Sequence, residues 1–466
     1  MSTGRLTPSP EQETAIQRMV AEPTRAVLNA STMGTGKTLC AVEVALRIGA
    51  RTVLVVAPPN TRLGWEATFA RQGCELPFKW LNSTVKGLGN LSDYEFGVEG
   101  VYFVGTELFA RWWKKRRDSG DQLWARGVDL VVMDETHRAQ SRKSLTYRAL
   151  QNTSASFRMA MSGTPGGNSF DGLWGTVRWL WPDLSGVGAV ADKSYYRWVD
   201  RWCETKFDRF VYGGKKVVGE KNPGEFVNSL PCYVRLDPPV GVGVVEETRL
   251  VGLGVKQRKA YDSLQNNLIA WLDSGVLVVD AGNMVYGRLR QAALALPMVR
   301  DDGVVDFDVD APSAKLDELR LIVADELDGE SALFLTDSQK FAVVVEARVR
   351  SWGFTVERWD GTVSQGKREG IKGRFVSGET RFVVAVVSAI SEGVDGFQHA
   401  TRNVVWLSKH GSGLHNEQAL ARVLRRGQVD VVRSFVLEAV DTVDSGQFSK
   451  LMLAALARHA ELAVAS

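Results

Sequence analysis

The sequence predicts an α/β protein with two parallel-sheet lobes in tandem and a helical and hairpin insertion between them. Short β-branched runs alternate with longer helical patterns along most of the chain. These runs are apolar throughout, which is typical of parallel strands covered by helices on both faces. The alternation weakens at about residue 183 and resumes near residue 315, which indicates two lobes. The expected strands lie at 51–59, 101–107, 128–135, 157–165, 331–338, 381–389 and 402–408.

The weakening of this pattern predicts four parts of the chain. They are a first lobe at 1–182, an insertion at 183–300, an acidic linker at 301–314 and a second lobe at 315–466. The linker is expected because its stretch combines Asp, Gly and Pro. Within the insertion we expect a hairpin that turns at Gly213-Gly214 and helices over about 255–298.

Composition excludes several classes of protein and leaves others open. The net charge of +3 and pI near 8.6 permit a nucleic-acid partner without indicating one. The four cysteines form no C-x-x-C pair, so a zinc ribbon or disulfide framework is not expected. No apolar run approaches the ~18 residues of a membrane helix, and the first residues lack a signal-peptide pattern. A cytoplasmic location is therefore the expectation.

The stretch "STMGTGKT" at 31–38 has the residues of a phosphate-binding loop, or P-loop. Gly34 and Gly36 allow a tight turn around Thr35, so that backbone N–H groups can face an anion. Lys37 supplies a positive charge for the β- and γ-phosphates of ATP, and the Thr38 hydroxyl can ligate Mg²⁺. The full motif has Gly where this chain has Ser31, so the loop alone does not establish a nucleotide site.

A second motif supports a nucleotide site. The apolar stretch "VVMDETH" ends in Asp134-Glu135, about 100 residues after the loop. Asp134 is expected to hold Mg²⁺ through water, and Glu135 to orient and deprotonate the attacking water. The alternative is an acidic pair on the surface at the end of a strand.

The order of four motifs resembles the superfamily 2 helicase core, in particular its Swi/Snf-type translocase branch. The motifs are "MGTGKT", the DEAH-like "DETH", "SGTP" and "QALARVLRRGQ", and the likeness covers roughly residues 5–440. The resemblance implies two RecA-like lobes, an ATP site in the cleft between them, and a compact form like that of bacterial or phage members. The chain departs from the family in "HGSGLH" at 410–415, where a Trp-Asn-Pro stretch is usual.

The resemblance assigns further residues to the ATP site. It places Gln12 at the adenine, and Gly393 and Asp395 at the nucleotide from the second lobe. Gln418, Arg422 and Arg425 have the spacing of one helix face, from which two arginines can reach a γ-phosphate. A solvated basic helix face is the alternative. The resemblance also implies that Ser162 and Thr164 of "SGTP" couple hydrolysis to movement, although a tight turn explains them too.

Contacts with nucleic acid are expected mainly at phosphates, because a motor that moves along any sequence cannot depend on base edges. The candidates are Asn60, Thr61, Arg62, Thr106, Lys215, Lys216, Lys409 and His410. The two lysines at 215–216 lie at the expected hairpin tip, where they could brace or part a duplex. The basic stretch at 111–120, with two Trp, and the aromatic stretch at 193–207 are better explained by inward packing of helices than by strand contact.

The sequence therefore predicts a DNA-stimulated ATPase that translocates on duplex or forked DNA, with ATP and Mg²⁺ as cofactors. Accessory replication, recombination or repair proteins are possible partners, and a monomer suffices for hydrolysis. The alternatives are a strand-separating DNA or RNA helicase and a slow ATP-gated switch that binds nucleic acid. A kinase or transporter subunit would not explain the second lobe.

Overall fold

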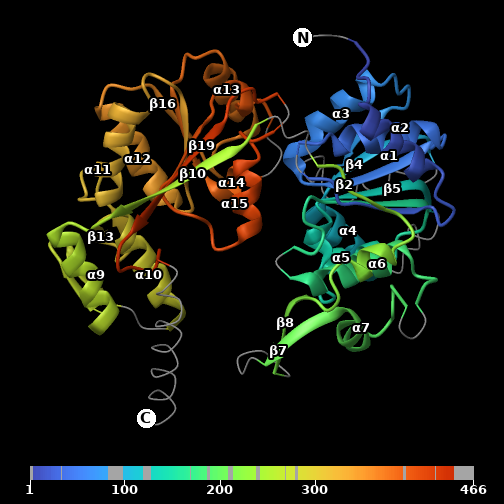
Figure 1. The fold of residues 1–466 in the computed structure, drawn as a ribbon, viewed down its shortest axis with the longest axis horizontal. Coiled ribbons are helices and arrows are strands. Elements are labelled where there is room, and N and C mark those ends of the chain that lie inside the picture. The colour runs from blue at the N-terminus through green and yellow to red at the C-terminus, as the bar shows by residue number, and fades with distance from the viewer. Residues whose placement is uncertain are drawn as a thin grey trace. The chain divides into compact units, whose positions relative to one another are not determined.

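The computed structural model describes most of the chain and divides it into two compact units, Met1–Pro239 and Val240–Ser466. Figure 1 shows both, and each is treated separately below. Among the described helices, none is both long and apolar enough to cross a membrane. The described residues are 4–32, 34–81, 98–118, 127–167, 169–185, 189–207, 214–237, 242–267, 269–278, 282–391, 395–425 and 427–445.

The first unit is built on a seven-stranded parallel sheet with the order β3-β4-β2-β5-β6-β1-β9. Its strands are β1 Ala26–Asn29, β2 Thr52–Ala57, β3 Phe78–Leu81, β4 Gly100–Gly105, β5 Val128–Asp134, β6 Ala155–Met161 and β9 Tyr233–Val234. The accompanying helices are α1 Pro10–Val20, α2 Lys37–Arg47, α3 Arg62–Arg71, α4 Thr106–Asp118, α5 Leu145–Gln151 and α6 Leu173–Leu180. Short helical turns η1 Pro59–Thr61, η4 Thr136–Ala139 and η5 Phe170–Gly172 follow three of the strands.

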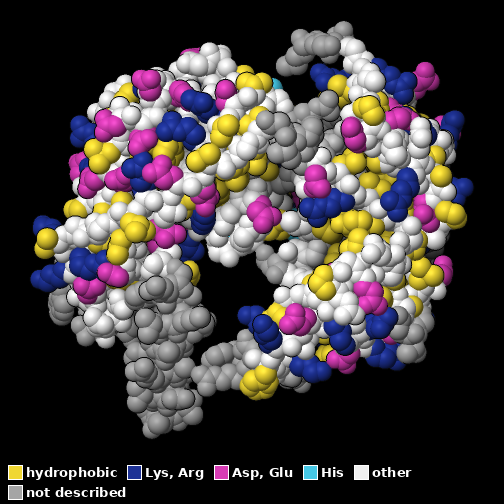
Figure 2. Space-filling view, viewed as in Figure 1, with side chains coloured by type: hydrophobic (Ala, Val, Ile, Leu, Met, Phe, Trp, Pro, Cys, Tyr) yellow, Lys and Arg dark blue, Asp and Glu magenta, His cyan; other side chains and the backbone are white. Residues whose placement is uncertain are grey.

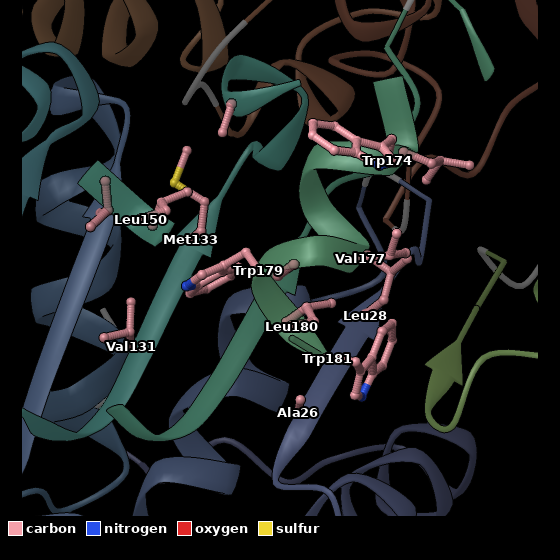
Figure 3. Close-up of a cluster of buried hydrophobic side chains, with 14 of the residues drawn as sticks. Ala26, Leu28, Val131, Met133, Leu150, Trp174, Val177, Trp179, Leu180 and Trp181 are labelled. Atoms are coloured by element: carbon pink, nitrogen blue, oxygen red, sulfur yellow. The ribbon is translucent and has the colours of Figure 1, made fainter. Parts of the chain in front are cut away.

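Both faces of this sheet are buried, as the apolar runs predict. Along β5, Val131 and Met133 join the core under α4 to α6, whereas Leu130 and Val132 join the core under α1 to α3. Figure 3 shows Val131 and Met133 on the same side of the sheet as the aromatic residues of α6. Continuous hydrophobicity is therefore required, because successive side chains point into opposite cores.

An aromatic cluster lies beyond α6 in the first unit. It is formed around α7 Tyr195–Trp202, the antiparallel pair β7 Cys203–Phe207 and β8 Lys215–Glu220, and α8 Glu225–Asn228. Trp198, Trp202 and Phe226 are buried together, with ring centroids 5.2 Å from Phe226 to each Trp. The inward packing expected for the aromatic stretch is thus confirmed for its helix.

The aromatic helix is shorter than the sequence predicts. It ends at Trp202, and Cys203 already begins β7, so Phe207 lies on a strand and not on the helix. The Phe207 side chain is 85% exposed. Helical spacing would put Phe207 on the same face as Trp198 and Trp202. In the structure Phe207 instead pairs with Lys215 across the two strands of the hairpin. The expected hairpin exists, while Gly213 of its expected turn lies outside the described residues.

The second unit contains a six-stranded parallel sheet with the order β10-β19-β18-β15-β17-β16. Its strands are β10 Val244–Val251, β15 Ala332–Thr336, β16 Val356–Trp359, β17 Phe382–Val386, β18 Asn403–Trp406 and β19 Val432–Ala439. The helices near it are α11 Ala314–Leu321, its π-helical continuation η6 Ile322–Glu326, α12 Gln339–Ser351, α13 Gln365–Val376, α14 Val387–Ile390, η7 Phe397–His399 and α15 Gly413–Leu420. Alternate residues of β15 again enter two different cores.

The units divide the chain differently from the four predicted parts. The expected insertion does not form a domain of its own: β9 pairs with β1 in the first sheet, and β10 pairs with β19 in the second. The expected linker contains β14 Val305–Phe307, which pairs with β13 Pro297–Val299. Its Asp, Gly and Pro residues mark the turns around a short strand. Periodicity missed β9 and β10 because one is very short and the other carries polar residues.

A small satellite core completes the second unit. It involves α9 Val255–Asn267, the antiparallel pair β11 Ile269–Leu272 and β12 Gly275–Val278, and α10 Gly282–Leu294. The helical stretch expected over 255–298 is therefore interrupted by a β-hairpin. Tyr261, which is fully buried, accepts a hydrogen bond from the Val443 N–H at 2.8 Å.

The aromatic cluster gives a first testable prediction. Phe226→Ala should lower the free energy of unfolding by about 3–5 kcal/mol, because the ring is fully buried among aromatic neighbours. Phe207→Ala, the matched control, should change it by less than about 0.5 kcal/mol because that ring is exposed. Urea denaturation monitored by tryptophan fluorescence measures both. Equal effects of the two substitutions would contradict the packing described here.

Candidate nucleotide-binding site

The carboxyl edge of the first sheet brings the predicted motifs to one level. Register aligns Asn29 and Asp134 with the same residue, Met161, of the strand between them. Glu135 and Ser162 directly follow two of these residues, and the phosphate loop begins at Ser31, two residues after Asn29. Because the strands are parallel, segments that are far apart in sequence leave the sheet side by side. The site was predictable to this extent from strand ends alone.

The phosphate loop has the backbone that its sequence predicts. Gly34 and Gly36 have φ values of 80° and 79°, a conformation that favours glycine. A side chain at Gly36 would also bring its Cβ within 2.5 Å of the Gln12 amide nitrogen. Ser31, where the full motif has Gly, accepts a hydrogen bond from the Leu236 N–H at 2.9 Å. The departure at Ser31 therefore fastens the loop to the segment after β9.

Lys37 and the start of α2 form the positive end of the loop. The Lys37 ammonium donates to the carbonyl oxygens of Ser31 at 2.9 Å and Thr32 at 3.0 Å. Helix α2 begins at Lys37, and its N-cap Gly36 has no side chain to occupy the first N–H groups. Thr38 is the next residue along the helix. The N–H groups of a first helical turn, together with a lysine, are the chemistry of an anion site.

Gln12 contacts the loop from α1. Its side-chain nitrogen donates to the Thr35 carbonyl at 2.7 Å, and its side-chain oxygen accepts from the Ser9 N–H at 2.8 Å. Ser9 in turn caps α1, so the amide of Gln12 is oriented by a capping box. The adenine role of Gln12 stays a prediction, while its contact with the loop is a further role that the sequence did not indicate.

The two carboxylates at the end of β5 are buried. Asp134 accepts from the Glu135 N–H at 3.0 Å and from the Trp65 indole N–H at 3.4 Å. Glu135 has φ 52°, an uncommon conformation for a side chain of this type. Each residue is 8% exposed, so the surface pair considered as the alternative is excluded. The contact of the Trp65 indole with Asp134 emerges only from the fold.

Glu135 belongs to a small polar network that reaches the third motif. The His137 Nδ1 lies 3.3 Å from Glu135 Oε2 and 3.2 Å from Ser162 Oγ. Ser162 Oγ lies 3.4 Å from Glu135 Oε2 and accepts from the Thr164 N–H at 3.2 Å. The network links the expected catalytic base to both residues expected to couple hydrolysis to movement. His137 was not singled out from the sequence, although its place in "DETH" could have found it.

Burial and the proximity of Glu135 raise the pKa of Asp134 to about 7, against an ordinary value of 3.8. Lys37 and the two hydrogen bonds act in the opposite direction but are outweighed. Two neighbouring buried carboxylates need a cation to be ionised together. The site therefore fits a phosphate chain at Lys37 and the start of α2, and Thr38 and Asp134 are the residues that would hold Mg²⁺. This fit rests on the chemistry of the donors.

In the second unit, the residues that were predicted to contact the nucleotide lie near one another, but they do not lie on a single helix. Arg425 Nη1 lies 3.2 Å from Asp395 Oδ1, and Arg422 donates to the Ser391 carbonyl. Helix α15 ends at Leu420, so the expected single helix face through the two arginines is wrong. After Leu420 the chain forms turns that include hydrogen bonds between residues three apart, such as Arg422 N–H to Ala419 O at 3.1 Å. Gln418 is buried in α15, and Gly393 lies outside the described residues.

The nucleic-acid candidates differ in accessibility. Arg62 pairs with Glu66 at 2.6 Å and places its guanidinium 4.6 Å from the Trp80 ring centroid. Thr106 is only 3% exposed, so it cannot take a phosphate without rearrangement. Lys409 is partly exposed and lies 3.4 Å from Glu246.

The remaining candidates occupy turns and one helix. Asn60 and Thr61 form η1 after β2, and the His410 N–H donates to Asn416 Oδ1 at 2.8 Å. In α4, Trp112 and Trp113 are buried, which confirms inward packing for the stretch at 111–120.

Comparisons with known proteins agree with the motifs. A family profile described as "Type III restriction enzyme, res subunit" matches residues 5–167. A "DNA repair and recombination protein RAD54-like" of Drosophila erecta is 22% identical over 86% of this chain and 55% of its own length. In its motif order and in these matches the chain resembles a superfamily 2 core of the Swi/Snf type. It spans about half the length of this curated relative.

Other curated relatives match smaller shares of this chain. The mouse "Chromodomain-helicase-DNA-binding protein 1-like" is 25% identical over 69% of this chain and 35% of its own length. The Saccharomyces cerevisiae "DNA repair and recombination protein RAD54" is 23% identical over 67% and 37%, respectively. Among solved structures, the "Sulfolobus solfataricus SWI2/SNF2 ATPase core in complex with dsDNA" aligns over 94% of this chain and 90% of its own, at 18% identity and TM-score 0.41.

The raised pKa of Asp134 predicts a pH-dependent gain of stability in Asp134→Asn. In the protein without nucleotide or Mg²⁺, the wild type should lose stability as pH rises from about 4 to about 7, because the unfolded chain ionises first. The variant lacks this loss. It should therefore be more stable than the wild type at pH 8, with an advantage that shrinks as pH falls toward 4. Thermal unfolding from pH 4 to pH 8 measures the difference.

Asp129, at the other end of β5, is the matched control. Burial acts against its ionisation, but hydrogen bonds from the N–H groups of Thr52 and Arg51 outweigh burial and lower its pKa. Asp129→Asn should therefore destabilise the protein at neutral pH, and this loss should fade in acid. A variant at Asp134 that behaved like the one at Asp129 would show that the site carboxylate is stabilised in its ionised form.

Proposed function

We propose that the chain hydrolyses ATP, with stimulation by DNA, and uses the energy to move along or remodel duplex or forked DNA. The observation that carries the proposal is the meeting of the phosphate loop with the buried Asp134 and Glu135 at one edge of a sheet. A structural acidic pair would not need burial beside a lysine and an open helix start. The names of the relatives, which include DNA repair and DNA-binding proteins, support the choice of DNA.

Hydrolysis needs each of these groups in a separate role. Lys37 and the N–H groups at the start of α2 hold the phosphates and offset their charge. Thr38 and Asp134 hold Mg²⁺, which supplies positive charge at the phosphates when bound. Glu135 accepts the proton of the attacking water, whose oxygen forms a bond to the γ-phosphorus while the bond to the β-phosphate oxygen breaks. The products are ADP and inorganic phosphate.

The polar network around Glu135 offers a route from hydrolysis to movement. When the charge near Glu135 changes, the hydrogen bonds of His137 and Ser162 must change with it. Ser162 holds the Thr164 N–H, and the chain then enters η5 and α6. We infer that this segment shifts with the nucleotide state and carries the shift to DNA-contacting surfaces.

Arg422 and Arg425 are proposed to act on the same nucleotide. Their contacts with Ser391 and Asp395 hold both guanidinium groups on the segment between β17 and β18. A guanidinium at the γ-phosphate would stabilise charge as the phosphoryl group leaves. One chain contains every proposed group, so a monomer suffices. Accessory repair or replication proteins remain proposed partners, and a cytoplasmic location remains a proposal.

The proposal predicts hydrolysis that depends on DNA structure and on Glu135. ATPase rates should rise strongly with duplex or forked DNA and less with single strands or RNA. Glu135→Gln should reduce the stimulated rate by about 10² to 10⁴-fold, the usual range for loss of a general base. Glu99→Gln, an exposed carboxylate paired with Arg51, should leave the rate unchanged.

Other outcomes would change the assignment. Stimulation confined to single strands or RNA would favour a strand-separating helicase. A slow rate that no nucleic acid changes, together with ATP-dependent DNA binding, would favour the switch. Equal rates in the wild type and Glu135→Gln would contradict the assigned catalytic base.

Arg425→Ala should reduce the DNA-stimulated ATPase rate by about a thousandfold, with little effect on ATP affinity, since arginine fingers act mainly on the transition state. Arg350→Ala removes an exposed arginine that pairs with Glu346 and serves as the control. Steady-state kinetics and nucleotide titration separate the two effects. A loss of ATP affinity without a lower maximal rate would assign Arg425 to ground-state binding.

A further inference from the structure

The free end of the β7–β8 hairpin carries an unusual set of side chains. Its last two cross-strand pairs are Lys206 with Lys216 and Phe207 with Lys215. Three of the four residues are therefore lysines, and the fourth is an aromatic residue. In Figure 2, basic and acidic side chains lie beside one another in the part of the first unit where Figure 1 places this hairpin.

Phe207 is far more exposed than the aromatic residues that pack together at the base of the hairpin. Its side chain is 85% exposed, whereas Trp198, Trp202 and Phe226 below it are buried. The ring lies against Gly214, because a Cβ at Gly214 would come within 3.0 Å of the ring. Gly214 has φ 69°, which also favours glycine. The backbone is thus shaped to let the ring lie there without burying it.

Two lysines of the hairpin stand directly opposite each other. Like charges directly opposite each other on antiparallel strands repel, and Lys206 and Lys216 are both exposed in this arrangement. Lys215 on the other pair lies 3.0 Å from Asp200 of α7, and both of these side chains are exposed. Two exposed ammonium groups this close together are suited to bind an anion.

The base of the hairpin is firmly attached to the segment that follows Ser162 and Thr164. Glu220, the last residue of β8, accepts hydrogen bonds from the N–H groups of Gly224 at 2.9 Å and Phe226 at 2.8 Å. Phe226 packs edge-on against Phe170 of η5, with centroids 5.5 Å apart. A shift of η5 would therefore be passed through packed aromatic rings to the hairpin.

We propose that the tip of the β7–β8 hairpin binds the junction between double-stranded and single-stranded DNA. Phe207 stacks on the base exposed at the junction, and Lys206 and Lys216 contact the flanking phosphates. An intact duplex offers no base face along its length, so a stacking ring requires a fork or an end. The lysine pair supplies charge complementarity to the backbone. This proposal rests on the proposed function and names the DNA structure that the motor engages.

The test uses the full chain and three labelled DNAs: a fork, a blunt duplex of equal length and a single strand. The fork carries 2-aminopurine beside its junction, because stacking on a protein ring quenches that base. Phe207→Ala should weaken fork binding by about tenfold and abolish the quench, with little change for the interior of the duplex. Phe207→Trp should keep the affinity, since it keeps a stacking ring.

A second arm tests the lysines through salt dependence. The double variant Lys206→Ala/Lys216→Ala should reduce the slope of log affinity against log salt by about 1 to 2, as expected for two lost phosphate contacts. Lys256→Ala/Lys259→Ala removes two exposed lysines from α9 and is the control for overall charge. Its slope should equal that of the wild type.

The outcomes separate this proposal from the proposed function. Equal fork affinity and equal quench in the wild type and Phe207→Ala would overturn the hairpin contact, even if DNA stimulates hydrolysis. A lysine double variant with the slope of its control would overturn the phosphate contacts. A further outcome is a quench that depends on Phe207 while no DNA changes the ATPase rate of the wild type. That result would support the hairpin contact and contradict the proposed DNA-stimulated translocase.

Discussion

Two adjacent carboxylates buried at the end of a buried strand are the constraint on which the first unit depends. Asp134 and Glu135 are each 8% exposed, and burial together with mutual repulsion favours protonation of Asp134. Lys37, the Trp65 indole and the Glu135 N–H favour the ionised form of Asp134, yet they do not outweigh burial and the repulsion by Glu135. A cation and a phosphate chain bound here would relieve this repulsion. Stability is given up at the place where charge is to be bound.

The parallel sheet is what brings such a site together. Its apolar strands enter two cores, so they leave the polar chemistry to the segments at their carboxyl ends. The phosphate loop, Glu135 and Ser162 leave the sheet at one level because their strands share a register. The aromatic cluster continues this arrangement outward, from η5 through Phe226 to the base of the β7–β8 hairpin. A nucleotide site and a proposed DNA contact are thus parts of one packed body.

Much of the candidate site could be predicted because its residues follow strands with a strong apolar signal. The strand before Asp134 and the glycines at 34 and 36 behave as the sequence indicates. The prediction failed for the arginines, whose helix ends at Leu420, since spacing alone does not reveal where a helix stops. It failed again at Phe207, where cross-strand pairing overrode helical periodicity. His137 and Trp65 contribute contacts that depend on distant partners.

The sequence by itself determined the class of fold, the identity of the phosphate loop and the acidic pair, and the motif order of a Swi/Snf-type core. Local patterns suffice for these features, because glycine conformations, strand burial and helix starts are set by neighbouring residues. Only the tertiary structure decided that β9 and β10 belong to different sheets, that Ser31 fastens the loop to Leu236, and that Phe207 stays exposed. These outcomes depend on pairing between segments far apart in the chain, whose energies no local pattern records.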